Sequence, residues 1–448
     1  MRNFSEGCCQ AVLAAHSASM ALIRNRRQEL LQQSSTGKRA ECPTIPRVRK
    51  RMQDIYRELG PKMFRRAFRM KYTVFNLLYT KIHSNLIQVM NRDRTKVRSH
   101  AVNGLIPLPV RLGCALRFWS GGDAHDLMLV FGISYCEVFR SVDFVREAVN
   151  QTPCLQLEFP TDHTKQKAIA KSFQQKSEVG FDNCVGCVDG LLIWMHMPSL
   201  EECEKVSVGQ TKFVCGRKSK FGLNMQAICD SKRRFLNILI LFGASASDML
   251  AFEASPIRVK MDRPGFLAEG LCLYGDNAYV NRAFMASPDP SRSGISVEDS
   301  YNFFHSQLRI NIECAFGILV NRWGFLRKKA PKNYSIKKTI STVSCLCSLH
   351  NFLIDQRCAV PEANTPSDAL TLAVDRAVPM ERAANGERVP GQLLEAGDHF
   401  DDDLNYTVRR SIYQTHQGRS LPRTAMIAHV ANKGMSRPVR NIERNGRR

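Results

Sequence analysis

Residues 273–284 read LYGDNAYVNRAF and follow directly on the residues GLC. The apolar residues 271–274 are typical of a buried strand, and the chain turns polar at Asp276, where that strand would end. Gly, Asp and Asn also favour turns for backbone reasons, which gives Gly275, Asp276 and Asn277 an ordinary explanation. A catalytic explanation requires other carboxylates that the fold brings to the same place.

The chain has 448 residues and a formal net charge of +23. Such an excess of positive charge points to a polyanionic partner, most simply nucleic acid. The cations are concentrated in the first 110 residues, and RVRKR at residues 47–51 also suits a nuclear-localisation patch or a solvated basic surface. No apolar run reaches the roughly 18 residues of a membrane span. We therefore expect a DNA-binding, nuclear protein without membrane association.

Sixteen cysteines could indicate disulfides, but many of them lie inside apolar runs, as buried free thiols do. We therefore expect a reducing compartment. Cys184 and Cys187 have the spacing of half a zinc site, with Cys203 and Cys215 only loosely available as a second pair. The simpler interpretation is that Cys184 and Cys187 are core residues.

Composition and periodicity divide the chain into five parts. The first is a basic flexible arm, the second a helical region that resembles a helix-turn-helix, and the third a polar helical linker. The fourth is a mixed α/β catalytic domain, and the fifth a loose tail that is basic at its end. These parts span residues 1–61, 62–150, 151–180, 181–356 and 357–448.

The helical region contains two short helices separated by a tight turn at residues 131–133. Asp123 can cap the first helix and Ser134 the second. Two helices with glycine in the turn form the helix-turn-helix pattern, in which the second helix meets a DNA groove. Ser134 and Arg140 would then face DNA, although the same geometry also occurs in plain helical bundles.

Short apolar runs at residues 184–189, 223–229, 235–242 and 271–274 predict four strands, and an apolar stripe predicts a long helix over residues 300–323. The polar turn CDSKRR suggests that the second and third runs form a hairpin. The order of these elements predicts an α/β fold with antiparallel pairing first and a crossover later.

Three carboxylates occupy informative positions in this scheme. Asp189 ends the first predicted strand, Asp276 ends the fourth, and Glu313 lies on the long helix. If the first and fourth strands are neighbours, their carboxylates meet at one edge of the sheet. His305, Arg309 and Glu313 follow at four-residue spacing and share a helix face, so His305 and Arg309 are candidate phosphate contacts.

Converging carboxylates repel each other unless a cation lies between them. Mg²⁺ or Mn²⁺ suits a site of this kind, because both prefer oxygen ligands and are commonly held by a few carboxylates plus phosphate. Two such ions can assist the displacement at a phosphodiester. The residues therefore predict a site for two divalent cations in a DNA-cutting enzyme, with an ordinary turn and a solvated helix as the simpler alternative.

Several motifs occur in an order that resembles the PIF/Harbinger transposases and their domesticated relatives. They include CVDG, LYGDNAYVNRAFM, RINIECAFG and CLCSLHNFLID, and the resemblance spans roughly residues 64–355. It implies an RNase H-like DDE domain with Asp189, Asp276 and Glu313 as catalytic residues and metal ligands. Asp248 matches a further family aspartate that is often preceded by His, where this chain has Ser247.

The resemblance implies a metal-dependent transposase or transposase-derived nuclease that cleaves DNA and transfers strands. It also implies a separate Myb/SANT-like DNA-binding partner protein. The main alternative is a domesticated, catalytically silent DNA-binding or scaffold protein that keeps the fold. A host-factor nuclease is a third possibility.

Overall fold

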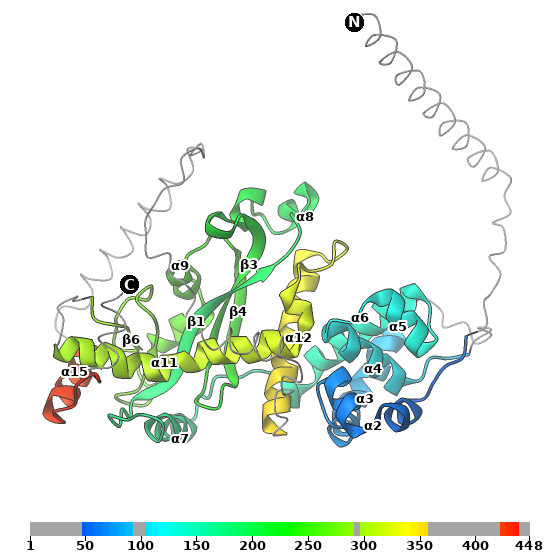
Figure 1. Ribbon diagram of the computed structural model, residues 1–448. Coiled ribbons are helices and arrows are strands. Elements are labelled where there is room, and N and C mark those ends of the chain that lie inside the picture. Colours follow the sequence, from blue (N-terminus) through cyan, green and yellow to red (C-terminus); the bar gives the residue numbers. More distant parts are fainter. Residues whose placement is uncertain (1–46, 93–103, 291–295, 357–421, 439–448) are drawn as a thin grey trace, which may run out of the picture. The chain divides into compact units, whose positions relative to one another are not determined.

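The computed structural model of the chain describes residues 47–92, 104–290, 296–356 and 422–438 (Figure 1). Most of the predicted arm and tail lie outside the described residues. Where they are described, both are more ordered than predicted, because helix α2 begins at Met52 and helix α15 (Pro422–Asn432) lies within the tail. No helix in these ranges is long and apolar enough to cross a membrane.

The described residues of the helical region form five helices. The apolar residues of the range 64–90 keep one helical spacing, but the helix breaks at Arg69, which adopts a left-handed φ of 63°. The break lets Phe64, Phe68 and Phe75 interlock as a buried aromatic cluster. The helices are α2 (Met52–Phe68), α3 (Tyr72–Arg92), α4 (Leu108–Trp119), α5 (Ala124–Phe131) and α6 (Tyr135–Gln151).

The two predicted helix caps are confirmed. Oδ1 of Asp123 accepts a hydrogen bond of 2.8 Å from the backbone N–H of His125 at the start of α5. Oγ of Ser134 accepts one of 3.4 Å from the N–H of Glu137 at the start of α6. Each cap satisfies a backbone donor that has no partner inside its helix.

A mixed sheet follows, as predicted. Strand β1 pairs antiparallel with β3 and parallel with β5, and β3 also pairs antiparallel with β4, which confirms the hairpin and the crossover. The first and fourth predicted strands are therefore neighbours. The strands are β1 (Cys184–Trp194), β2 (Val214–Cys215), β3 (Lys220–Cys229), β4 (Phe235–Gly243), β5 (Cys272–Tyr274) and β6 (Met285–Ala286).

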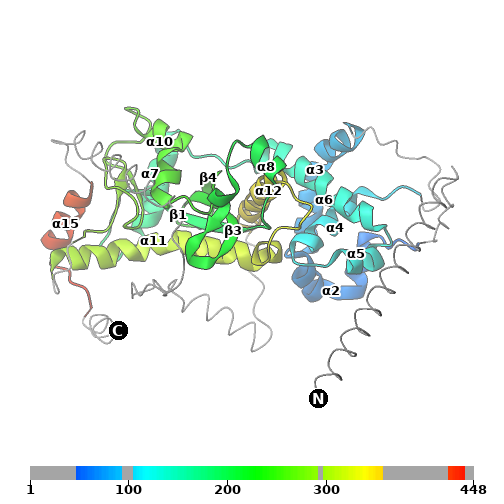
Figure 2. The same cartoon turned by 90° about the horizontal axis from the view of Figure 1, so that it is seen from above.

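Different helices cover the two faces of the sheet (Figure 2). Helix α11 (Val297–Arg322) packs its apolar stripe against one face, next to inward-facing residues such as Cys187 and Met225. The other face carries Val188 and Ile228 and is covered by α7 (His163–Gln174), α9 (Asp248–Glu253) and α10 (Pro256–Met261). Since side chains alternate along a strand, adjacent residues of β1 serve different environments.

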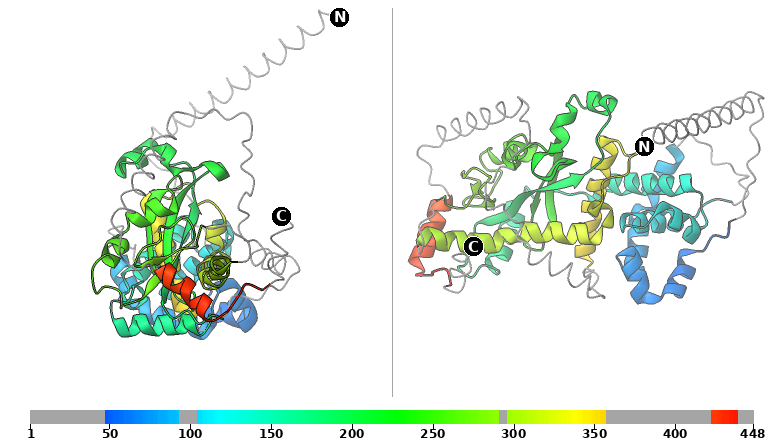
Figure 3. Two further views of the ribbon diagram at one scale, coloured as in Figure 1. Left: turned by 90° about the vertical axis from the view of Figure 1, so that its left-hand side faces the viewer. Right: turned by 45° about the horizontal axis from the view of Figure 1, so that its top comes forward.

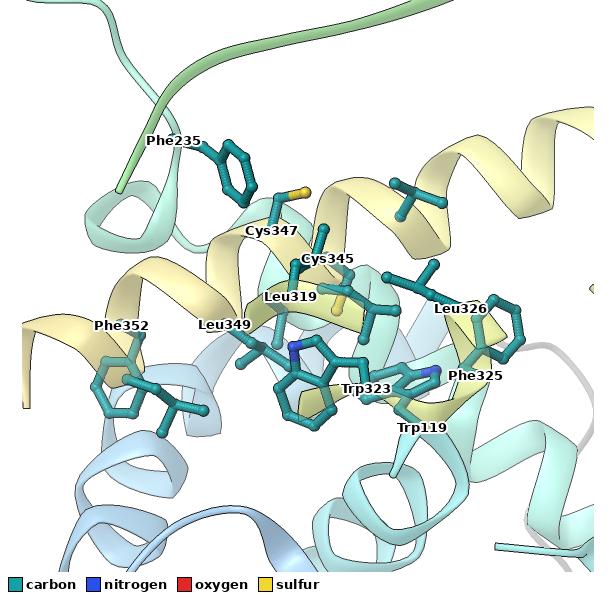
Figure 4. Close-up of a cluster of buried hydrophobic side chains, with 14 of the residues drawn as sticks. Trp119, Phe235, Leu319, Trp323, Phe325, Leu326, Cys345, Cys347, Leu349 and Phe352 are labelled. Atoms are coloured by element: carbon teal, nitrogen blue, oxygen red, sulfur yellow. The ribbon is translucent and has the colours of Figure 1, made fainter. Parts of the chain in front are cut away.

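The end of α11 lies in a large apolar cluster (Figure 4). Trp323 is fully buried there against helix α12 (Ile336–Asp355), and the equally buried Trp119 of α4 joins the same cluster. A polar contact reinforces the packing, because Asn150 Nδ2 of α6 donates to Ser341 Oγ of α12 at 2.9 Å. This core anchors the C-terminal end of the helix that carries Glu313.

Helix α15 packs on the other end of α11 (Figure 3). Met426 and Val430 are buried, and Arg437 beyond the helix forms an ion pair of 3.0 Å with Asp299 near the start of α11. His429 Nε2 lies 3.0 Å from the carbonyl oxygen of Val179. This part of the tail is ordered because its apolar and basic side chains find partners on the sheet domain.

Candidate metal and catalytic site

Asp189 and Asp276 meet at the edge where β5 ends. The parallel pairing of β1 and β5 ends at Cys187 and Tyr274, and the two aspartates follow two residues later on their respective chains. Residues two apart on a strand point to the same face. The sequence predicted that the strand ends at Asp189, but β1 continues to Trp194 as an antiparallel partner of β3.

The Asp189 carboxyl is held in an environment that disfavours its charge. Its residue is only 7% exposed, and burial, aided by the nearby Asp276 carboxylate, raises its pKa to about 7. The N–H of Gly190, which donates to Oδ1 at 2.8 Å, and the charge of Arg309 act in the opposite direction. A carboxyl in this situation is stabilised by any further cation that reaches it.

Asp276 does form the turn that its sequence favours, and the packing of this turn explains why a glycine precedes it. Asp276 Oδ1 accepts a hydrogen bond of 2.8 Å from the N–H of Ala278, and the chain then folds Tyr279 into the interior. A Cβ on Gly275 would lie 2.7 Å from Cδ2 of Tyr279, which is closer than real Cβ atoms approach. Glycine is therefore required for packing, while the same turn fixes one oxygen of the Asp276 carboxyl.

Arg309 joins the carboxylates of β1 and α11. Its Nη2 lies 2.6 Å from Glu313 Oε1, and its Nη1 lies 3.8 Å from Asp189 Oδ2. Burial lowers the pKa of Arg309, but Glu313, Asp189 and Asp276 together outweigh burial and raise it overall. One guanidinium thus neutralises carboxylates from two elements, where the sequence predicted a metal ion.

Asp248 approaches from the opposite face of the sheet. Its Oδ1 accepts hydrogen bonds from Asn224 Nδ2 at 3.1 Å and Gln226 Nε2 at 2.8 Å. Gln226 Oε1 accepts in turn from the Tyr279 hydroxyl at 2.6 Å, which links Asp248 to the turn after Asp276. Burial raises the pKa of Asp248, the two amides lower it, and Asp276 raises it again.

Gly190 allows this approach. A Cβ at Gly190 would lie 1.9 Å from Asp248 Oδ1 and 2.8 Å from Gln226 Nε2. The Asp-Gly pair at residues 189–190 therefore places a carboxylate on one face of β1 and leaves room for a second carboxylate on the other. Sequence reasoning missed Asn224 and Gln226, although their alternation within LNMQAIC places both on one face of β3.

His305 lies on the same helix as Arg309 but does not reach the site. It is fully buried, stacks on Tyr274 with ring centroids 4.7 Å apart, and has Nε2 3.0 Å from the carbonyl oxygen of Ala286. Burial lowers its pKa to about 3, so the ring is neutral. This placement fits a core histidine and not the phosphate contact predicted from the shared helix face.

The candidate DNA contacts on α6 have structural partners. The Ser134 hydroxyl caps the helix, and Arg140 Nη1 lies 2.8 Å from Glu137 Oε1. Arg111, which is buried, holds the other Glu137 oxygen at 2.9 Å. The start of α6 is therefore occupied by an internal ion-pair network rather than by freely available cations.

Cys184 and Cys187 are core residues rather than half of a zinc site. Both are buried among apolar side chains, and burial raises the pKa of the Cys184 thiol well above its usual value. A zinc ligand must be a thiolate, so this environment favours the protonated core thiol.

The carboxylate site fits a hard divalent cation by its donor set. Asp189, Asp276, Glu313 and Asp248 offer only oxygen. Burial raises the pKa of Asp189 and of Asp248, and the neighbouring Asp276 carboxylate raises both further. Across the described ranges, no three His, Cys, Asp or Glu side chains stand close enough together to enclose a metal ion as they are. Arg309 supplies the positive charge in this arrangement.

Comparisons with known proteins place part of the chain near one family. Residues 188–351 match the family model described as DDE superfamily endonuclease. Protein ALP1-like from Arabidopsis thaliana is 22% identical over 315 residues, which cover 66% of this chain and 71% of that protein. No solved structure matches. Residues 188–351 therefore form a domain similar to the DDE superfamily endonucleases, and this domain contains Asp189, Asp248, Asp276 and Glu313.

Proposed function

We propose that this chain is a metal-dependent DDE nuclease of the PIF/Harbinger type, built on an RNase H-like sheet, that cuts DNA phosphodiester bonds. The observation that carries the proposal is the meeting of carboxylates from β1, the end of β5 and α11 around one guanidinium. The net charge of +23 supports a polyanionic substrate. Strand transfer and a nuclear location belong to the same proposal.

Asp189, Asp276 and Glu313 would hold the divalent cations, with Asp248 as a further oxygen donor. When bound, such ions supply charge stabilisation for the attacking and leaving oxygens of the phosphodiester. Arg309, which is paired with Glu313 at 2.6 Å, would be the group that pairs with a substrate phosphate, since a guanidinium matches phosphate geometry. Tyr279 and Gln226 keep Asp248 and the Asp276 turn in a fixed relation.

The test is cleavage of a labelled DNA duplex in Mg²⁺ or Mn²⁺ by the full chain. We expect Asp189→Asn and Glu313→Gln each to lower the rate by about 10³-fold or more, because a lost carboxylate removes several kcal/mol of charge stabilisation. Glu298→Gln, near the start of the same helix, is the control and should cleave normally. Undiminished cleavage in both site variants would contradict the proposal.

A catalytically silent DNA-binding protein is the second candidate. The ion pair of 2.6 Å between Arg309 and Glu313 favours it, because it neutralises a carboxylate without any metal. Calorimetric titration with Mn²⁺, run beside the cleavage assay, separates the two candidates. Metal binding without cleavage would favour the silent protein or a missing Myb/SANT-like partner, and co-purification from nuclear extract would then test for that partner.

A further inference from the structure

The turn between β2 and β3 carries a group of cations that the proposed site does not use. Residues 216–220 read GRKSK, and the three cations Arg217, Lys218 and Lys220 are exposed; these three side chains are called the basic turn below. Within the described ranges, none of the three lies within 4 Å of a carboxylate oxygen. Other surface cations, such as Lys205 and Arg258, each pair with an acid four residues away. The basic turn is therefore an unneutralised positive patch.

The basic turn lies on the same face of the sheet as Asp248. Gly190 and Trp194 alternate onto one face of β1, and their partners Gln226 and Gly222 lie on that face of β3. The strand continues from Gly222 by two residues to Lys220, which keeps the face. This face of the β1–β3 ribbon thus leads from Asp248 to Lys220 of the basic turn.

Trp194 forms the surface between them. Gly222 leaves room for its indole, since a Cβ there would lie 3.3 Å from Trp194 Cε3. Lys220 Nζ lies over the same ring, 5.4 Å from its centroid. An aromatic ring beside a cation is a common platform for single-stranded nucleic acid, because bases stack on the ring while the cation binds phosphate.

We propose that the basic turn and Trp194 form a DNA-backbone binding surface that guides the strand leading into the carboxylate site. This inference rests on the proposed function, because it takes DNA as the substrate. The surface holds phosphates of that strand without any divalent cation.

The experiment measures DNA binding in EDTA, so that it is independent of cleavage. Fluorescence anisotropy with a labelled duplex gives the dissociation constant of the full chain at several salt concentrations. The test variant carries Arg217→Gln, Lys218→Gln and Lys220→Gln. The control variant carries Lys165→Gln, Lys167→Gln and Lys171→Gln on α7, which removes the same charge. Helix α7 lies at the other end of β3, where Ser172 Oγ contacts Ser231 Oγ at 2.6 Å.

We expect the basic-turn variant to bind about tenfold more weakly near physiological salt. Its salt-dependence slope should fall by about 3, which is roughly one for each phosphate that the variant no longer neutralises. The α7 variant should change the dissociation constant less than about twofold. Equal losses of affinity in both variants, or an unchanged affinity in the basic-turn variant, would overturn the inference. A parent chain that binds DNA through the basic turn but never cleaves it would contradict the nuclease proposal alone.

Discussion

The two faces of the β1–β3 ribbon stabilise buried carboxylates by different means. On the α11 face, Asp189 and Glu313 share the charge of Arg309. On the α9 face, Asp248 is held by the neutral amides of Asn224 and Gln226. The two arrangements meet at adjacent residues of β1. Asp189 belongs to the first, and Gly190 leaves room for Asp248 in the second.

This difference between a cationic and an amide partner indicates which carboxylates can exchange their partner for a metal ion. A cation that neutralises carboxylates can be replaced by another cation with little change in charge balance. Amide donors are directional and neutral, so they fix the orientation of a carboxylate without cancelling its charge. We therefore expect a metal ion to replace Arg309 on the α11 face, and the amides to hold Asp248 in place as a further oxygen donor.

The largest expected effect on stability comes from adding a side chain at Gly190, next to Asp248. Gly190→Ala should lower the free energy of unfolding by about 3 kcal/mol, because the new methyl group displaces Asp248 from its amides. Chemical denaturation measures the change. Gly317→Ala on α11 is the control, since nothing lies within 4 Å of a Cβ at that position. It should be neutral or stabilising, as alanine favours helix interiors. Equal stability of the two variants would show that Asp248 does not depend on Gly190.

The strand pattern of this site could be predicted from the sequence. The apolar runs gave the strand order, and the carboxylates at the ends of β5 and on α11 followed from helix and strand periodicity. What could not be predicted is which polar groups face each other across the sheet. Arg309 and His305 lie four residues apart on one helix, yet only Arg309 reaches the carboxylates, because His305 packs beneath Tyr274.

The break at Arg69 and the docking of α15 were also missed, for a related reason. Apolar spacing near Arg69 continues across the break, so periodicity alone gives one helix. Helix α15 is short and marginal by itself, and it is stabilised by buried contacts on α11 that lie far away in the sequence. Both features depend on tertiary packing rather than on local pattern.

Acid should remove the stability that neutral, buried His305 contributes. His305 has a pKa of about 3 in the folded chain against 6.5 as its usual value, so the unfolded chain binds a proton that the folded chain does not. Its contribution to stability is complete above pH 6.5 and is lost as the pH falls toward 3. Between pH 7 and pH 5 the loss is about 2 kcal/mol.

Urea unfolding at both pH values measures this loss, with His305→Gln as the comparison. The variant has no group that titrates in this range at that position, so its unfolding free energy should fall about 2 kcal/mol less than that of the parent chain. An identical pH dependence in the two proteins would mean that burial does not hold His305 neutral.

Removing the guanidinium of Arg309 should strengthen the binding of a divalent metal ion. Arg309→Met should raise the Mn²⁺ affinity of the DNA-free chain about tenfold, or about 1.4 kcal/mol, because the metal no longer competes with the guanidinium. Calorimetric titration measures the affinity. Arg258→Met removes an equivalent ion pair with Glu253, at 3.0 Å, on the α9 side and should leave the affinity unchanged. Weaker Mn²⁺ binding by Arg309→Met would show that the guanidinium organises the ligands instead of competing for them.

The smallest expected effect concerns the charge of Asp248. In Asp248→Asn, the carbonyl oxygen can still accept from Asn224 and Gln226, while the charge that burial and Asp276 disfavour disappears. The metal-free chain should therefore gain about 1 kcal/mol in unfolding free energy. Asp123→Asn, at the cap of α5, is the control of opposite sign. It should lose stability, because the backbone N–H of His125 donates to Asp123 Oδ1 at 2.8 Å and holds the pKa of that carboxyl below its usual value. A loss of stability in Asp248→Asn as well would mean that a cation, and not the amides alone, compensates the α9 face.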